Sequence, residues 1–420
     1  MNLATWIERN GRTFGTHPAL AEGHRVHADW ATYARTTAAV AGGLREHFAL
    51  VPGDRVAIVM RNRPEYLEAM FAIWHAGMVA VPVNARLHRD EIKYILEHSE
   101  AAVVLTDDEH ATDVESLVGE VPALKAAVLA PGADWSRLTG AGPVALVDRA
   151  PTDAAWLFYT SGTTGRPKGA TLTNRNLLMM SLSYFADIDA ITSNDCVLHA
   201  APISHGSGLY GLPHIAKGAV SVIPHSGGVD GDEIASLLNR WPGMTFFAAP
   251  TMVKRLAGDP AIAAANLNNL KTIIYGGAPM YLADLEEGLA FFGPKLSQIY
   301  GQGETPMTIT ALSKAEHADH TEPDQHDGTK ESADAPRTVT LCRKKGDQHD
   351  HRQGHNGPLK IGINQLQPFD SREHRHRRGD RAVTIKKRAP GKPERGQQKR
   401  VFWPTLAHHE RCQRENAAFT

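Results

Sequence analysis

Cysteine and long apolar runs are scarce in this sequence of 420 residues. It has three cysteines, Cys196, Cys342 and Cys412, and they are scattered along the chain. Three scattered cysteines cannot form a disulfide framework, so we expect a reducing, cytoplasmic location. No apolar run approaches the length of a membrane span. The first nine residues are amphipathic and lack the apolar core of a signal peptide, so we expect no targeting segment there.

A large excess of charge of one sign is also missing. The formal net charge is −1, which argues against a nucleic acid or another polyanion as the partner of the whole chain. With 42% hydrophobic and 22% charged residues, the composition is that of a globular protein. A chain of this length has room for about two or three domains. The composition does not indicate an oligomeric state.

Glutamine is nearly absent from the first three quarters of the chain. Only Gln298 and Gln302 precede residue 314, whereas eight glutamines follow it. The charge changes at the same place, because residues 1–313 carry 23 basic and 31 acidic residues and residues 314–420 carry 22 and 15. Ten of the 22 histidines also lie in the second segment. We therefore expect a boundary between residues 313 and 314.

Strands and helices alternate in the first part of the chain. Apolar runs at 56–60, 79–83 and 102–106 predict buried strands, and the segments 64–76 and 90–98 between them have the apolar spacing of helices. Pro64 suits the first position of a helix, and Gly77 suits the position after its end. This order predicts an α/β fold with a parallel sheet that is covered on both faces.

The stretch 159–170, Tyr-Thr-Ser-Gly-Thr-Thr-Gly-Arg-Pro-Lys-Gly-Ala, follows a predicted strand at 154–159. Its glycines let backbone N–H groups approach phosphate oxygens, its hydroxyls add donors, and Lys168 adds a positive charge. The spacing differs from that of the P-loop, so we predict another kind of phosphate-binding loop. A Ser/Thr/Gly-rich surface turn is the alternative interpretation.

Apolar runs at 197–202 and 246–251 also predict strands. Three further segments are candidates for ligand contacts. His205 lies among small residues, including Gly206, Gly208 and Gly211, which would leave room for a ligand. A strand at 272–275 precedes Gly276–Pro279, and such turns at the carboxyl ends of strands are common ligand sites. The alternative interpretation of His205 is a packed loop residue, and that of Gly276–Pro279 is a tight turn without a ligand. The third segment is Tyr300-Gly-Gln-Gly-Glu-Thr-Pro306.

Together the stretches at 159–170 and 300–306 resemble the signatures of the adenylate-forming, or AMP-binding, ligase superfamily, and most closely the acyl-CoA synthetases. The resemblance covers residues 1–313. It implies the large N-terminal domain of that superfamily, with layered parallel sheets and helices, and a role in fatty acid metabolism. It also implies ATP and coenzyme A as co-substrates, Mg²⁺ as the metal, and a small carboxylic acid as the substrate.

The resemblance assigns a role to each matching residue. Lys168, Glu304 and His205 would be catalytic, with Glu304 holding Mg²⁺ and His205 bordering the carboxylate pocket. One carboxylate is adequate for Mg²⁺, which also binds phosphate oxygens and water. Gly303 departs from the family pattern, in which threonine is usual, and Thr305 lies close by. The residues expected to bind the nucleotide are Thr160, Ser161, Gly162, Thr163, Thr164, Gly165, Lys168, Gly276, Gly277, Ala278, Pro279, Tyr300, Gly301 and Thr305.

The resemblance stops at Ser313. Residues 314–420 contain Arg378-Gly-Asp380 but neither the threonine before the glycine nor the apolar strand of the family's ribose-binding segment. No hinge and no small C-terminal domain with its lysine are recognisable. We therefore expect adenylation and transfer to coenzyme A to be impaired, with a truncated, non-catalytic nucleotide-binding protein as the alternative.

Several interpretations of residues 314–420 remain open. A basic nucleic-acid-binding arm is favoured by 374–378 and 386–388, but aromatic residues for base stacking are scarce before Phe402 and Trp403. A metal site is another alternative, although the His pairs at 349–351 and 374–376 and the cluster at 408–412 lack a second set of ligands. We favour a shifted reading frame or a fusion, because the segment has few apolar runs and the composition of a disordered tail.

Overall fold

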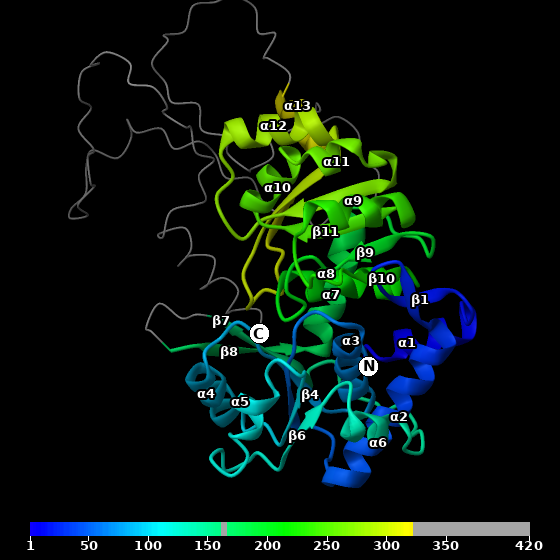
Figure 1. Ribbon diagram of the computed structural model, residues 1–420, viewed down its shortest axis with the longest axis vertical. Coiled ribbons are helices and arrows are strands. Elements are labelled where there is room, and N and C mark those ends of the chain that lie inside the picture. Colours follow the sequence, from blue (N-terminus) through cyan, green and yellow to red (C-terminus); the bar gives the residue numbers. More distant parts are fainter. Residues whose placement is uncertain (161–165, 322–420) are drawn as a thin grey trace, which may run out of the picture. The chain divides into compact units, whose positions relative to one another are not determined.

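The computed structural model describes residues 1–160 and 166–321, and the side chains of these residues up to His317. The described residues form two sheets with helices packed on them (Figure 1), within one compact unit that spans Met1–His326. None of the helices within these residues combines the length and the hydropathy that a membrane-spanning helix needs.

A six-stranded sheet contains most of the strands predicted in the first part of the chain. Its strands lie side by side in the order β6-β5-β3-β4-β7-β8, and all neighbours are parallel except β7 and β8. The bounds of these strands are β3 Arg55–Val59, β4 Val79–Pro82, β5 Val103–Thr106, β6 Ala126–Leu129, β7 Ala154–Thr160 and β8 Lys168–Thr173.

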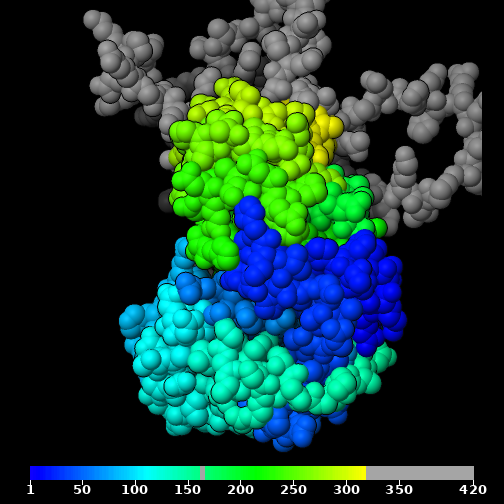
Figure 2. Space-filling model, turned by 45° about the vertical axis from the view of Figure 1, so that its right-hand side comes forward, coloured from blue at the N-terminus to red at the C-terminus, as the bar shows by residue number. Residues whose placement is uncertain are grey.

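An eight-stranded sheet has the order β14-β13-β12-β11-β9-β10-β1-β2. Its central strands are parallel, and the hairpin partners β2 and β14 run antiparallel at the two edges. The strands are β1 Pro18–Glu22, β2 Arg25–Asp29, β9 Cys196–Leu198, β10 Val220–Ile223, β11 Met244–Ala248, β12 Leu270–Tyr275, β13 Leu296–Tyr300 and β14 Thr310–Leu312. On the face drawn in Figure 2, the dark blue N-terminal residues border both the cyan and the green parts of the chain.

Helices follow the strands as the alternating pattern predicts. Proline is the first residue of α3, α10 and α11, where the missing N–H costs nothing. The described helices are α1 Thr5–Thr13, α2 Trp30–Phe48, α3 Pro64–His75, α4 Arg89–Ser99, α5 Ala111–Glu115, α6 Ala133–Thr139, α7 Asn174–Asp187, α8 Gly206–Ala216, α9 Gly231–Arg240, α10 Pro250–Ala257, α11 Pro260–Ala264, the 3₁₀ turn Leu267–Asn269, α12 Leu282–Phe292 and α13 Lys314–Thr321. The predicted α/β fold with parallel sheets is confirmed.

Helix α3 joins the two sheets through a continuous core. All twelve of its residues are buried, as expected for a helix enclosed by other elements. Its core cluster includes residues of β4 and β7 as well as Leu209 and Leu212 of α8. A row of aromatic contacts leads from Trp74 of α3 to Trp156 and then Phe158 of β7. This core fixes the end of β7 relative to α8, which begins directly after His205.

Two predicted strands are shorter than the sequence suggested. We expected strands at 197–202 and 246–251, but β9 ends at Leu198 and β11 ends at Ala248. Pro250 begins α10, because its ring fixes a helical φ and it has no N–H to donate to a neighbouring strand. The residues after Leu198 form a segment of turns that leads to α8.

Helix α13 continues the described body past Ser313. The ammonium of Lys314 lies 2.7 Å from the carboxylate of Asp189, and buried His317 lies 2.9 Å through Nε2 from the hydroxyl of Tyr275. The boundary expected after residue 313 stays a prediction. The histidine and arginine clusters of the tail lie outside the described residues.

Candidate active site

The predicted phosphate loop connects two antiparallel strands at the edge of the six-stranded sheet. Thr160, the last residue of β7, is paired with Lys168, the first residue of β8. Thr160 is half-buried and Lys168 is exposed, so the ammonium is accessible to a ligand. The predicted ligand-binding residues Ser161, Gly162, Thr163, Thr164 and Gly165 lie outside the described residues.

Side chains of β7 anchor the hairpin on both faces of the sheet, as the alternation of a strand dictates. The hydroxyl of Tyr159 lies 2.8 Å from Nδ1 of His98 in α4. Burial of the Tyr159 side chain raises its pKa to about 12, so the phenol is neutral near pH 7. Trp156 and Phe158 point to the other face and belong to the central core. The start of the phosphate loop is therefore rigidly placed.

Gly303 brings the segment 300–306 against the hairpin formed by β7 and β8. A Cβ atom at residue 303 would lie 2.9 Å from Cγ2 of Thr160 and would overlap the ring of Phe158. The absence of threonine here thus has a physical reason, because the phenyl ring of Phe158 occupies the space that a side chain would need. Two segments that are 140 residues apart in the sequence meet at this point.

The remaining residues of the segment 300–306 form a turn between β13 and β14. Tyr300 is half-buried at the end of β13, and Glu304 is exposed. Gly301 also lies in close contact with backbone, since a Cβ there would overlap the carbonyl of Met307. The hydroxyl of Thr305 accepts a hydrogen bond of 3.2 Å from the backbone N–H of Gln302. Thr305 therefore stabilises the turn with the hydroxyl that we expected to be close to the phosphates.

The turn Gly276–Pro279 lies beside this segment, because β12 and β13 are parallel neighbours. Gly276 is buried, and a Cβ there would lie 2.6 Å from the carbonyl oxygen of Ile299. Gly277 adopts a φ of 82°, a conformation that favours glycine, and is exposed. Ala278 is half-buried and Pro279 is exposed. The turn therefore presents its edge to solvent at the carboxyl end of the sheet.

His205 directly precedes α8, and its side chain contacts β7 of the six-stranded sheet. Its ring meets the ring of Phe158 edge-on, with a centroid distance of 5.2 Å, and its Nδ1 lies 2.9 Å from the hydroxyl of Ser204. Burial lowers the pKa of His205 below its ordinary value, which favours a neutral imidazole near pH 7. A neutral ring against an aromatic wall suits an apolar or acyl ligand better than an ionic one.

The small residues after His205 do not leave an open space, contrary to our expectation. They form the first turns of α8, which is buried from Gly206 to Ile215. A Cβ at Gly206 would lie 2.9 Å from the ring of Phe247, and one at Gly211 would lie 2.9 Å from the ring of His199. These glycines let α8 approach its neighbours closely, so their role is packing.

Asn62 and Phe247 lie beside candidate site residues, and the sequence did not indicate either of them. The side-chain amide of Asn62 donates to the carbonyls of His199 and Ala201 at 2.7 and 2.8 Å, and its oxygen accepts from the N–H of Ile203 at 2.9 Å. Asn62 thus ties the loop after β3 to the segment that leads to His205. Phe247 contacts Gly206 and lies 4.0 Å from a Cβ placed on Gly277. Neither residue belongs to a motif, and only their contacts identify them.

The residues present fit an Mg²⁺ ion that is held mainly by a nucleotide. Among the described residues, no group of three or more His, Cys, Asp and Glu side chains could enclose a metal by itself. Glu304 offers one accessible carboxylate in the turn whose Gly303 contacts Thr160. Mg²⁺ commonly uses one or two carboxylates together with phosphate oxygens. Such an ion would neutralise phosphate charge at this place.

Comparison with known proteins places this arrangement in a family. The model of the AMP-binding enzyme family matches residues 7–360, which extends past Ser313. A feruloyl-CoA synthase from Amycolatopsis is 35% identical over 325 residues, covering 76% of this chain and 62% of that protein. A long-chain-fatty-acid–CoA ligase from Thermus thermophilus is 32% identical over 330 residues, covering 75% and 60%. The chain therefore spans about three fifths of the length of these curated relatives.

Solved structures share the fold. The N-terminal domain of FACL13 from Mycobacterium tuberculosis, an inhibitor complex, has a TM-score of 0.68 at 24% identity, covering 76% of this chain and 80% of that one. ATP-bound MatB from Rhodopseudomonas palustris has a TM-score of 0.62 at 27% identity, covering 74% and 62%. The resemblance noted in the sequence is confirmed, and the chain belongs to the AMP-binding enzyme family that includes the acyl-CoA ligases.

Proposed function

We propose that this protein activates a carboxylic acid with ATP and passes the acyl group to coenzyme A. In the first step, a carboxylate oxygen of the acid forms a bond to the α-phosphorus of ATP, and the bond from that phosphorus to the pyrophosphate oxygen breaks. In the second step, the thiol sulfur of coenzyme A loses its proton to water and forms a bond to the acyl carbon, and the bond from that carbon to the phosphate oxygen of AMP breaks, so that AMP leaves. The reducing location suggested by the few cysteines, the cytoplasm, is part of the proposal.

The contact of Gly303 with Phe158 and Thr160 is the observation that carries this proposal. This contact joins the end of β7 to the turn that contains Glu304. The turn at Gly276 lies beside them, because β12 and β13 are neighbouring strands. The nucleotide-binding residues of a single ligand must converge in this way. Three isolated surface turns would have no reason to do so.

We assign the following roles to candidate residues that the structure describes. Lys168 and the hydroxyl of Thr160 would hold the departing pyrophosphate, and Glu304 would hold Mg²⁺, which spreads the developing negative charge. Gly276–Pro279 and Tyr300 would bind the adenine through backbone contacts and the tyrosine ring. Such a site contributes mainly by positioning and by electrostatic stabilisation of the transition state.

The carboxylic acid would lie near His205. The neutral imidazole and the ring of Phe158 would form one wall of its pocket, and Phe247, which contacts Gly206 and faces Gly277, would form another. Aromatic walls favour an aryl or aliphatic acid over a strongly polar one. The relatives named feruloyl-CoA synthase and long-chain-fatty-acid–CoA ligase support both kinds of acid as candidates.

ATP–pyrophosphate exchange on the purified full chain tests the first step. A panel of aryl and aliphatic acids should produce exchange that depends on the acid and on Mg²⁺. Nucleotide binding in titration calorimetry without exchange for any acid would instead favour a non-catalytic nucleotide-binding protein.

The second step requires its own measurement. Mass spectrometry of a reaction with ATP, Mg²⁺, coenzyme A and the best acid of the panel would detect acyl-CoA. We expect less acyl-CoA than the exchange rate would allow, because the family's second-step residues are not recognisable after Ser313 in the sequence. Acyl-CoA formed as fast as the adenylate would show that residues 314–420 supply that function.

A further inference from the structure

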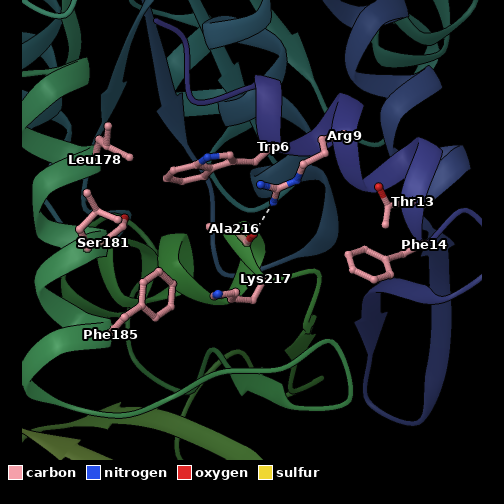
Figure 3. A pocket seen from close by; sticks show the side chains of 10 residues that line it. Trp6, Arg9, Thr13, Phe14, Leu178, Ser181, Phe185, Ala216 and Lys217 are labelled. Atoms are coloured by element: carbon pink, nitrogen blue, oxygen red, sulfur yellow. Dashed lines mark hydrogen bonds between the residues drawn. The ribbon is translucent and has the colours of Figure 1, made fainter.

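A cavity lies on the molecule apart from every residue of the candidate active site. Its volume is about 350 Å³, and it is lined by Trp6, Arg9, Thr13, Phe14, Leu178, Ser181, Leu182, Phe185, Ala216 and Lys217. In Figure 3, residues of α1 and of α7 face each other across the end of α8. Its size is at the lower end of the range of about 300–1,000 Å³ that is usual for small-molecule sites.

The walls of the cavity are mainly apolar and are only partly covered by protein. Trp6, Leu178 and Phe185 are half-buried, and Leu182 keeps 48% of its surface exposed. Helices α1 and α7 both pack on α8, which holds them on either side of its last turn. Aromatic and aliphatic side chains in this arrangement could bury an apolar chain or ring, which stabilises a complex by about 0.8 kcal/mol for each CH₂ group removed from water.

Two positive charges border the apolar walls, and no acidic residue is among the lining residues. Arg9 donates to the carbonyl of Ala216 and to Oδ1 of Asn10 through Nη2, at 3.1 Å for the latter. These bonds orient the guanidinium and leave other N–H groups for a ligand, because arginine has five. The ammonium of Lys217 lies 4.9 Å from the centroid of the Phe185 ring.

From this combination we infer that the cavity binds an amphiphilic monocarboxylate, a molecule with an apolar tail and a single carboxylate. The tail would lie against Trp6, Leu178 and Phe185, and the carboxylate would approach Arg9 and Lys217. Charge complementarity favours an anion over a neutral molecule, because Arg9 and Lys217 are the charged residues of the lining, both are exposed, and neither forms an ion pair within the part of the chain that the structure describes. This inference does not rest on the proposed function, because none of the lining residues belongs to the candidate active site.

Photocrosslinking locates the ligand on the full chain. The probe is decanoate with a photoreactive diazirine in its tail, and the labelled peptides are identified by mass spectrometry. We expect labels in peptides that contain residues 6–14 and 178–185, and we expect excess decanoate to compete with them. Labels confined to peptides of the candidate active site, labels without competition, or no labels would overturn the inference.

Charge variants test the role of the two cations. The double variant Arg9→Gln/Lys217→Gln should weaken competition by decanoate about tenfold, as expected when charge-assisted contacts are lost. Decanol, which lacks the charge, should compete weakly and equally in both proteins, and inorganic phosphate should not compete. Equal competition by decanoate and decanol in the parent protein would reject a carboxylate site.

A matched control removes two exposed arginines from the two helices, α1 and α7, that line the cavity. Arg12→Gln/Arg175→Gln changes the net charge by the same amount in α1 and α7, but neither residue lines the cavity. Labelling should remain as in the parent, and melting temperatures should confirm that all variants fold. A loss of labelling in this control would show a general charge effect and reject the site.

Lipid vesicles separate a free ligand from a membrane surface. Phosphatidylcholine vesicles that contain the probe should label the cavity no more than the same free concentration of probe does. Labelling that occurs only with vesicles would replace the inference with docking of this face on a lipid layer.

Discussion

The two sheets contribute to the candidate active site in different ways. The six-stranded sheet supplies an exposed edge hairpin, in which Lys168 projects into solvent and is paired through its backbone with Thr160. The eight-stranded sheet supplies turns that are packed into the protein, such as the one at Gly276. The proposed ligand contacts are thus separate from structural contacts in the hairpin and combined with them in the packed turns. Substitutions should therefore affect binding alone in the hairpin, but binding and stability in the packed turns.

The largest effect should come from Glu304→Gln. This residue belongs to the eight-stranded side but is exposed, so the substitution should leave stability unchanged. Loss of an electrostatic contact to the transition state typically lowers a rate by about 10²–10³-fold, and we expect that decrease in ATP–pyrophosphate exchange. Glu287→Gln on α12 is the matched control, because Glu287 is also exposed. An exchange rate within about twofold of the parent would remove Glu304 from the proposed metal site, given that such contacts are worth far more.

The buried histidines His199 and His214, which belong to the packed region around α8, should make the folded protein less stable in acid. Burial lowers the pKa of His199 to about 3 and that of His214 to about 4, and Nε2 of each ring has no hydrogen-bond partner among the described residues. The unfolded chain binds protons below about pH 6.5 while the folded chain does not, so the stability falls as the pH decreases from 7 to 5. The loss should be on the order of 2–4 kcal/mol for the two histidines.

Urea denaturation at several pH values measures this loss. The variant His214→Gln should show a weaker pH dependence than the parent, whereas His17→Gln, which changes an exposed histidine, should not. A pH dependence that is unchanged in His214→Gln would mean that other groups control acid stability.

Gly303→Thr should disrupt the contact between the segment 300–306 and strand β7. The new side chain would overlap the ring of Phe158, and overpacking of this kind typically costs about 1–3 kcal/mol. Removing the ring in Phe158→Ala should relieve the overlap, so the double variant should be more stable than the sum of the two single effects predicts. Denaturation of the four proteins gives this coupling energy, and additive effects within about 0.5 kcal/mol would show that the two residues do not interact.

A further substitution, at Asn62, tests the packing of the segment that precedes His205. Asn62→Ala removes one side chain that satisfies three backbone groups, and unsatisfied buried groups typically cost about 1–3 kcal/mol. Hydrogen exchange should increase at the amide of Ile203 and its neighbours. Asn194→Ala, at an exposed asparagine, is the control. Unchanged exchange would mean that Asn62 does not hold this segment.

The smallest change in stability should come from Lys168→Ala in the hairpin. An exposed lysine contributes little packing, so the free energy of unfolding should change by less than about 0.5 kcal/mol. The affinity for ATP in titration calorimetry should nevertheless fall about tenfold, because a charge near the phosphates is lost. Arg166→Ala, also exposed and in the same hairpin connection, is a comparison that tests whether the position of the charge matters. Unchanged ATP affinity would count against the proposed role of Lys168.

Local signals allowed much of the fold to be predicted from the sequence. Apolar runs marked β3, β4 and β5, and Pro64 and Gly77 marked the two ends of α3, because strand burial and helix boundaries depend mostly on neighbouring residues. The strand ends near Leu198 and Ala248 were not predicted correctly. There the apolar residues continue past the last backbone pair, and pairing depends on strands that are distant in the sequence.

For the site, the sequence by itself determined the motifs, their order and the family, since hydroxyls, glycines and a lysine in one loop are a local pattern. Only the tertiary structure decided what the small residues do. Gly206 and Gly211 resemble a ligand-binding loop in the sequence but serve the packing of α8, and Gly303 departs from the family pattern because Phe158 occupies the space beside it. The positions of Asn62 and of the cavity beside Trp6 and Phe185 were likewise decided by the fold alone. The physical reason is that steric exclusion and hydrogen bonding act between atoms that are close in space, whatever their separation along the chain.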